Sequence, residues 1–238
     1  MNRFPLALAM VLSAGAVAQE QMQDEPFWGG NINLGFISTA GNTDTQTLNF
    51  SFDFGRDGPR WRHGLHLEAY NNASDDERTA EKYLGAWQSN LKFNQRQSMF
   101  FRGQYEEDKF SSYQNQLTLT LGYGHRVIDD ENIVLDLEAG PGYRRSELAD
   151  TGDIEEEGIA RLAGNFKWNI SSTAAFGQLL SVEKGRENTV ARSNSSLTVA
   201  VTEALALKVA YNVRWNQHVD AGFENWDRET TVSVVYRW

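Results

Sequence analysis

Charged side chains recur at alternate positions along many stretches of this chain. Arg102, Gln104 and Glu106 illustrate the spacing, because the residues between them are Gly103 and Tyr105. Side chains that are two residues apart in an extended chain project from the same face. Charges that gather around a narrow passage can select ions by their sign. Ion selection is therefore the first chemistry that these residues suggest.

The face that carries these charges leans basic, although the whole chain has a formal net charge of −10. Two interpretations follow. In the first, a positive wall makes a narrow channel that favours small anions. In the second, basic and acidic side chains pair across a barrel and plug it. The charged residues that we expect to line the lumen are Arg62, Glu68, Lys82, Lys92, Arg102, Glu106, Arg126, Asp136, Glu138, Arg144, Arg161, Lys167, Lys208 and Arg214.

The four histidines are the natural candidates for acid–base chemistry. His63 and His125 fall on the apolar side of the alternation, and His66 falls on the charged side. Only His218, which lies near Asp220, resembles part of a Ser–His–acid set, and no serine stands beside it. The chain has no phosphate-binding glycine loop and no metal-ligand spacing. We therefore predict a protein that is not an enzyme and has no catalytic, cofactor or metal site.

The segments that position these residues alternate between apolar and polar side chains, as in Leu117, Leu119, Leu121 and Tyr123. We count about twelve such segments, each as long as a tilted strand that crosses a membrane. The fold class that we predict is all-β: a transmembrane, antiparallel, up-and-down β-barrel. The expected strands are 28–39, 46–56, 61–71, 80–93, 98–107, 113–127, 132–144, 157–169, 173–184, 190–202, 205–217 and 226–238.

Tight turns such as RDGPR alternate along the chain with longer polar connections, a rhythm typical of outer-membrane barrels. The long connections belong at the outer end if the N-terminus is periplasmic. The acidic runs Asp75–Glu77 and Glu155–Glu157, together with Asp150 and Asp153, are then expected in outer loops. Because their spacing matches no defined calcium loop, solvated loops are favoured over cation sites.

In this arrangement the aromatic residues of the apolar face gather near the two ends of the strands. The core of a soluble protein would not require that distribution. Amphipathic rings gather at both membrane–water interfaces. The expected periplasmic girdle consists of Trp28, Trp61, Phe93, Tyr123, Trp168 and Trp238, and the expected outer girdle of Tyr83, Trp87, Tyr105, Tyr143 and Trp215.

The two ends of the chain suggest its destination. Residues 1–18 have one basic residue, an apolar run and a small-residue triplet, which predicts a signal peptide cleaved after Ala18. Residues 19–27 would form a periplasmic segment, and residues 28–238 a barrel in the cell outer membrane. The ending TVSVVYRW resembles the C-terminal strand that the barrel-assembly machinery reads, so that machinery, membrane lipid and lipopolysaccharide are expected partners.

Composition removes several other classes of function. Without cysteine the chain can form neither disulfides nor thiolate metal sites. It has no apolar run of 18 residues after the signal sequence, so no transmembrane helix is expected. An acidic net charge argues against nucleic acid as a partner.

Several stretches resemble one family. The segment GFISTAGNTDTQTLNFSFDF, with its turn at residues 41–43, is similar to the first strands of the YdiY-like, salt-induced outer-membrane proteins (domain of unknown function 481). Residues 105–110, 122–124 and 137–143 resemble the middle of that family. The resemblance implies an outer-membrane barrel linked to salt or osmotic stress, and it implies no substrate or catalytic residue.

The function that we predict is a narrow, weakly anion-preferring channel for small solutes. The alternative is a closed, non-conducting barrel that serves envelope integrity. A lipid-modifying outer-membrane enzyme is the interpretation that the residues favour least.

Overall fold

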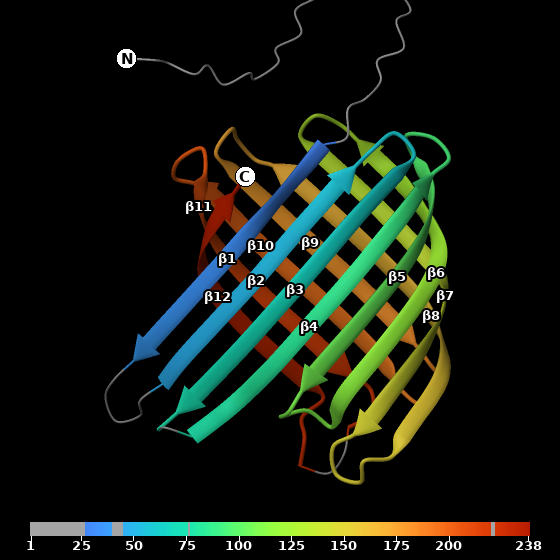
Figure 1. The fold of residues 1–238 in the computed structure, drawn as a ribbon, viewed down its shortest axis with the longest axis vertical. Coiled ribbons are helices and arrows are strands. Elements are labelled where there is room, and N and C mark those ends of the chain that lie inside the picture. Colours follow the sequence, from blue (N-terminus) through green and yellow to red (C-terminus); the bar gives the residue numbers. More distant parts are fainter. Residues whose placement is uncertain (1–26, 40–44, 76, 220–221) are drawn as a thin grey trace, which may run out of the picture.

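A computed structural model describes residues 27–39, 45–75, 77–219 and 222–238 of the chain. These residues form a closed antiparallel barrel in which each strand pairs with its neighbours in sequence (Figure 1). The predicted fold class is therefore confirmed. The strands are β1 (Phe27–Thr39), β2 (Thr45–Asp57), β3 (Trp61–Ser74), β4 (Glu77–Lys92), β5 (Gln97–Asp108), β6 (Tyr113–Asp129), β7 (Ile133–Leu148), β8 (Ile154–Asn169), β9 (Ala174–Lys184), β10 (Thr189–Ala200), β11 (Leu205–Asn216) and β12 (Trp226–Arg237).

The barrel closes where β12 pairs with β1. The paired residues run from Asn31 opposite Arg237 to Leu34 opposite Val234, and Gly30 and Trp238 exchange backbone hydrogen bonds beyond them. This seam closes the barrel, so the first and last strands pair with each other and do not remain as two free edges. Over the described residues, no helix is long and apolar enough to cross a membrane.

Both ends of the described wall, Phe27 and Trp238, lie at the same end of the barrel, at the top of Figure 1. We call this the near end and the opposite one the far end. The apolar set of each strand faces outward and remains exposed, as with Leu121 and Val234. The polar set faces inward and is largely buried, so the inside of this protein is its polar part.

The expected contrast between short and long connections is mostly absent, and this part of the prediction is wrong. Only residues 75–76 separate β3 from β4, and residues 149–153 separate β7 from β8. Glu77 and Glu155–Glu157 lie within strands instead of loops. Charged residues continue the pairing beyond the apolar part of the wall, because strand pairing is a backbone interaction that tolerates polar side chains facing water.

Strands β6 and β7 approach each other closely at two glycines. A Cβ atom on Gly140 would lie 2.1 Å from the carbonyl oxygen of Leu121, and one on Gly122 would lie 2.7 Å from the ring of Phe100. Phe100 points into the lumen and is 1% exposed. The missing side chains therefore allow the wall to bend and allow a ring to pack inside it.

Replacing Gly140 with alanine should destabilise the barrel, because the added Cβ meets backbone that cannot move aside. We expect a loss of about 1–3 kcal/mol in the free energy of unfolding, measured by urea titration of the refolded protein. Gly158→Ala is the matched control, since its Cβ would meet nothing within 4 Å. Equal stability of the two variants would contradict this account.

Candidate functional site

Three adjoining cavities follow the inside of the barrel. Two lie at the near end, with volumes of about 550 Å³ and about 690 Å³. The third, of about 430 Å³, lies deeper. Arg102 lines all three, and Asp53 and His66 line both the second and the third. The lumen is thus hollow from Trp238 at the near rim to Asp227, the second residue of β12 at the far end.

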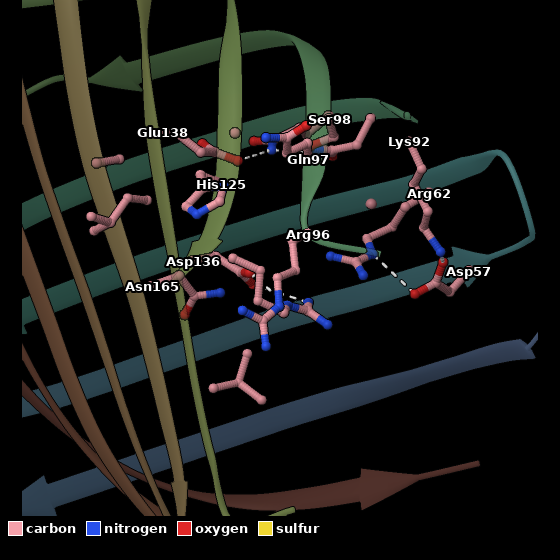
Figure 2. Close-up of a pocket in the computed structure, with 18 of the residues that line it drawn as sticks. Asp57, Arg62, Lys92, Arg96, Gln97, Ser98, His125, Asp136, Glu138 and Asn165 are labelled. Carbon is pink, nitrogen blue, oxygen red and sulfur yellow. Dashed lines mark hydrogen bonds and ion pairs between the residues drawn. The ribbon is translucent and has the colours of Figure 1, made fainter. Parts of the chain in front are cut away.

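The first cavity, which we call the vestibule, is strongly basic (Figure 2). Its carboxylates are outnumbered, because only Asp57, Asp136 and Glu138 contribute acidic groups. The basic residues that line it are Arg62, Lys92, Arg96, Arg102, Arg126, Arg161 and Lys167. The vestibule therefore carries a net positive charge, as a wall that attracts anions must.

Part of this positive charge is neutralised within the wall. Asp57 pairs with Lys92 and, at 3.0 Å, with Arg62. Arg126 Nε lies 2.8 Å from a carboxylate oxygen of Asp136. Each of these pairs holds long side chains against the wall and keeps them out of the passage.

A fourth vestibule cation, Arg161, pairs with Glu138 at 3.0 Å. The other three have no acidic partner among the described residues. Arg96, Arg102 and Lys167 have no carboxylate within 4 Å, which sets them apart from the paired cations of the same wall. Arg102 donates instead to the amide oxygens of Gln104 at 2.8 Å and Gln88 at 3.4 Å. These three side chains present uncompensated positive charge to the lumen.

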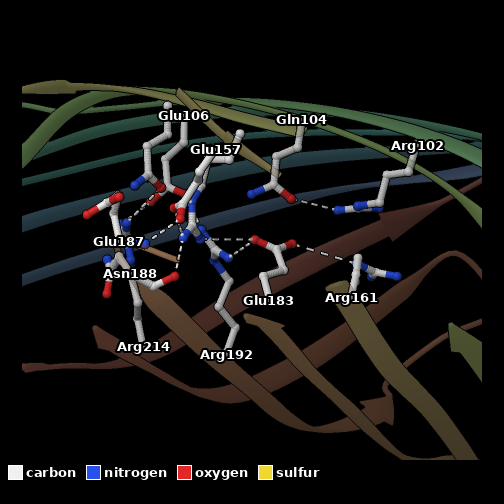
Figure 3. Close-up of polar contacts among 12 residues, drawn as sticks. Arg102, Gln104, Glu106, Glu157, Arg161, Glu183, Glu187, Asn188, Arg192 and Arg214 are labelled. Carbon is white, nitrogen blue, oxygen red and sulfur yellow. Dashed lines mark hydrogen bonds and ion pairs between the residues drawn. The ribbon is translucent and has the colours of Figure 1, made fainter. Parts of the chain in front are cut away.

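Deeper in the barrel, Glu106 of β5 joins opposite walls (Figure 3). Its carboxylate lies 3.1 Å from Arg192 on β10 and 3.7 Å from Lys82 on β4, and it also pairs with Arg214 on β11. Glu106 is 3% exposed. Strands β5 and β10 lie on opposite sides of the barrel order, so these pairs cross the lumen. One carboxylate shared by three cations compensates part of the cost of burying them.

A second carboxylate, Glu183 of β9, extends this network. Its oxygens lie 3.2 Å from Arg192, 3.7 Å from Arg161 and 3.9 Å from Arg144. Arg144, only 1% exposed, also donates to Glu157 and to the backbone oxygen of Asn188, each at 2.5 Å. The far half of the lumen is therefore filled on the β5–β9 side by ion pairs.

The far rim is tied together by a smaller cluster. Lys109, in the turn between β5 and β6, lies 2.5 Å from Glu81, which also pairs with Arg78. The hydrogen bond to Glu81 raises the pKa of Lys109 above its ordinary value. The turn is thereby held against β4.

The family described as "Protein of unknown function, DUF481" matches residues 32–238. The chain belongs to the DUF481 family. It is 31% identical to the uncharacterized protein YdiY of Escherichia coli (strain K12), over 97% of this chain and 94% of that one. The family resemblance in the sequence is thus confirmed.

Solved structures show a likeness to this DUF481 barrel in fold alone. A structure of the NanC porin is 13% identical, with a TM-score of 0.53, over 87% of this chain and 98% of that one. The COG4313 outer-membrane channel from Pseudomonas putida F1 is 8% identical, with a TM-score of 0.51, over 94% of this chain and all of the other.

The structure places the predicted lumen residues of this DUF481 barrel in two groups. Most of them line a cavity, and Glu106 and Arg144 lie in the cross-lumen network instead. The sequence analysis missed several charged residues of the interior, although the same alternation places most of them inward. The missed residues are Asp57, Glu157, Arg192, Asp227 and Glu229.

One girdle residue is misplaced by the sequence analysis. Trp87 was expected in the outer girdle, but its ring lies 5.5 Å from His63, which stacks on Trp61 of the periplasmic girdle. The error arises because β4 begins at Glu77, so Trp87 lies near its other end. At the far end, the sequence analysis missed Trp226, which packs 6.2 Å from Trp215. Phe93 and Trp238 lie one residue beyond the near ends of β4 and β12, and the other predicted girdle residues lie in the expected halves of their strands.

The described residues hold no group of His, Asp and Glu side chains arranged to bind a metal ion. His66 lies 2.6 Å from Asp53 and 3.4 Å from Glu68, within the lumen wall. The backbone nitrogen of His218 donates to Asn188, and Asp220, its expected neighbour, lies outside the described residues.

Glu106→Gln should destabilise the barrel, because the buried Arg214 and the partly buried Lys82 and Arg192 lose the carboxylate that they share. We expect a loss of about 3–5 kcal/mol in the free energy of unfolding, measured by urea titration. Glu107→Gln is the control, since Glu107 is the next residue of the strand and takes part in no ion pair within 4 Å. The control should change stability by less than about 0.5 kcal/mol. A stable Glu106→Gln barrel would show that the network is dispensable.

Proposed function

We propose that this protein is an outer-membrane channel for small solutes and that it prefers anions. The hollow lumen carries the proposal, since three adjoining cavities extend from Trp238 to Asp227. A barrel that served only as a structural wall would need no hollow of this length.

The outer surface supports a membrane location. Apolar side chains such as Leu119, Leu162 and Val209 are exposed along the middle of the wall. Tryptophans lie near both ends, with Trp28 and Trp61 at the near end and Trp226 at the far end. An exposed apolar band between two aromatic rims is typical of a surface that contacts a bilayer and is unfavourable in water. We place the near end at the periplasm. An exported chain reaches the outer membrane from the periplasm, and both Phe27 and Trp238 lie at the near end.

Charge along the passage supports the preference for anions. The vestibule has seven basic residues (Arg62, Lys92, Arg96, Arg102, Arg126, Arg161 and Lys167) and three acidic ones (Asp57, Asp136 and Glu138). The deeper cavity is nearly balanced, with Lys82, Arg102, Arg161, Arg192, Lys208 and Arg214 against Asp53, Glu68, Glu183, Asp227 and Glu229. An anion is therefore concentrated at the near end and meets little net field beyond it.

The network around Glu106 and Glu183 limits the size of the solute. It occupies the β5–β9 side of the far half, so the passage follows the opposite wall. Asn33, Ser51, Asn212 and Ser233, all uncharged, contribute to that wall. The free space there suits hydrated ions and small organic solutes, and it excludes polymers.

The network also favours a second candidate, the closed barrel with a role in envelope integrity. In that case the ion pairs would seal the lumen and the cavities would be isolated pools of water. The two candidates differ in a single measurable property, which is conductance.

The channel is tested by single-channel recording of the refolded protein in a planar bilayer, with a gradient of potassium chloride. We expect small, steady currents and a reversal potential that favours chloride. The double variant Arg102→Gln with Lys167→Gln should lower the chloride-to-potassium permeability ratio by about twofold or more, because two uncompensated charges leave the vestibule.

Lys184→Gln is the matched control, since Lys184 is an exposed residue at the far end of β9, on the outward face. It should leave the reversal potential unchanged. A silent bilayer, with folding verified by heat-modifiable gel mobility, would reject the channel and favour the closed barrel. Currents whose selectivity the double variant does not alter would reject the vestibule as the origin of the preference.

A further inference from the structure

A row of polar residues interrupts the apolar outer wall close to the near end. Arg56 of β2 stands opposite His63 of β3, and His63 stands opposite Ser89 of β4. All three belong to the outward set of their strands, together with Phe54 and Leu65. Polar side chains on a face that contacts lipid lower stability unless a partner satisfies them.

Aromatic rings hold the middle of this row in place. The His63 ring is stacked on Trp61, with 5.8 Å between centroids, and lies 5.5 Å from Trp87. Ser89 Oγ lies 2.8 Å from His63 Nδ1 and accepts a hydrogen bond of 2.8 Å from Trp87 Nε1. The side chains of Trp61, His63, Trp87 and Ser89 hold one another in place. His63 Nε2 takes part in none of these contacts and is available to a ligand.

Arg56 supplies charge that the protein does not compensate. Its guanidinium carbon lies 4.8 Å from the centre of the Trp28 ring, and no described carboxylate lies within 4 Å of it. Arg60, in the turn that follows β2, adds a second exposed cation to this rim. Packing on Trp28 fixes the guanidinium plane and leaves its N–H donors available.

We propose that Arg56, His63 and Ser89 form a binding site for the phosphate of a glycerophospholipid in the near-end leaflet. A guanidinium donates two parallel hydrogen bonds to phosphate oxygens, and the histidine and serine add neighbouring polar atoms. Trp28, Trp61 and Trp87 lie where the acyl chains begin, the level at which tryptophan is favoured. This site rests on the proposed membrane location and is independent of conduction through the lumen.

A comparison within the barrel supports this assignment. Arg228 at the far end also lies over a tryptophan, 5.6 Å from the Trp226 ring, but its cross-strand neighbour is the apolar Val213. Arg145, another outward arginine, is already paired with Glu156 at 3.7 Å. Arg56 differs from both because it combines uncompensated charge with a polar row and an aromatic frame.

The test is native mass spectrometry of the refolded full chain in an uncharged detergent, titrated with phosphatidylglycerol. Diacylglycerol with the same acyl chains, which lacks the phosphate, is the first comparison, and hexa-acylated lipid A is the second. We expect one phosphatidylglycerol to bind more tightly than either. Arg56→Gln should weaken that binding about tenfold, the value of a charge-assisted hydrogen bond, and the matched Arg228→Gln should not change it.

Three results would overturn the proposal: equal binding of diacylglycerol, unchanged binding by Arg56→Gln, or tighter binding of lipid A. If Arg56→Gln fails to fold, His63→Phe replaces it, because it keeps the ring stack and removes the polar atoms. It should also weaken phosphatidylglycerol binding, and unchanged binding would reject the site. A silent bilayer with intact lipid selectivity would reject the channel alone.

Discussion

Closure of the sheet is the constraint on which the rest of this structure depends. Pairing β12 with β1 closes the barrel, and closure also places the inward side chains of every strand in one narrow space. Because the outer face is largely apolar, buried polar residues such as Glu106, Arg144 and Arg214 lie on the inner face. Charged side chains inside the barrel therefore lose part of their hydration, and the arrangement of the interior charges offsets that cost.

That arrangement separates two kinds of charge. Glu106 and Glu183 draw cations from several strands into the cross-lumen network, and this compensates the desolvation of buried arginines. Arg102 and Lys167 have no acidic partner, and both line the two larger cavities, where water can solvate them. Paired charges thus fill one side of the far half of the lumen, and unpaired charges face the two larger cavities, because a buried charge without a partner is costly.

The sequence predicts the wall better than the interior. Period-two alternation places twelve strands to within a few residues, because a one-residue slip would turn every apolar side chain inward. It also separates inward charges from outward ones. It cannot predict that Glu106 meets Arg192 and Arg214, because contacts across a lumen depend on the stagger and tilt of strands far apart in the chain. The misplacement of Trp87 has a related cause, since the height of a residue depends on where its strand begins.

The same limit explains why Arg56 escaped notice in the sequence. Alternation places it outward, and a single arginine among outward phenylalanines does not by itself indicate a binding site. Only the register shows that Arg56, His63 and Ser89 stand side by side on three strands, and only the rings of Trp61 and Trp87 show that the middle of the row is held rigidly. The outer wall is thus patterned as specifically as the lumen. Both faces of the barrel wall thus carry cations that have no carboxylate within 4 Å among the described residues, Arg102 and Lys167 on the inner face and Arg56 on the outer face.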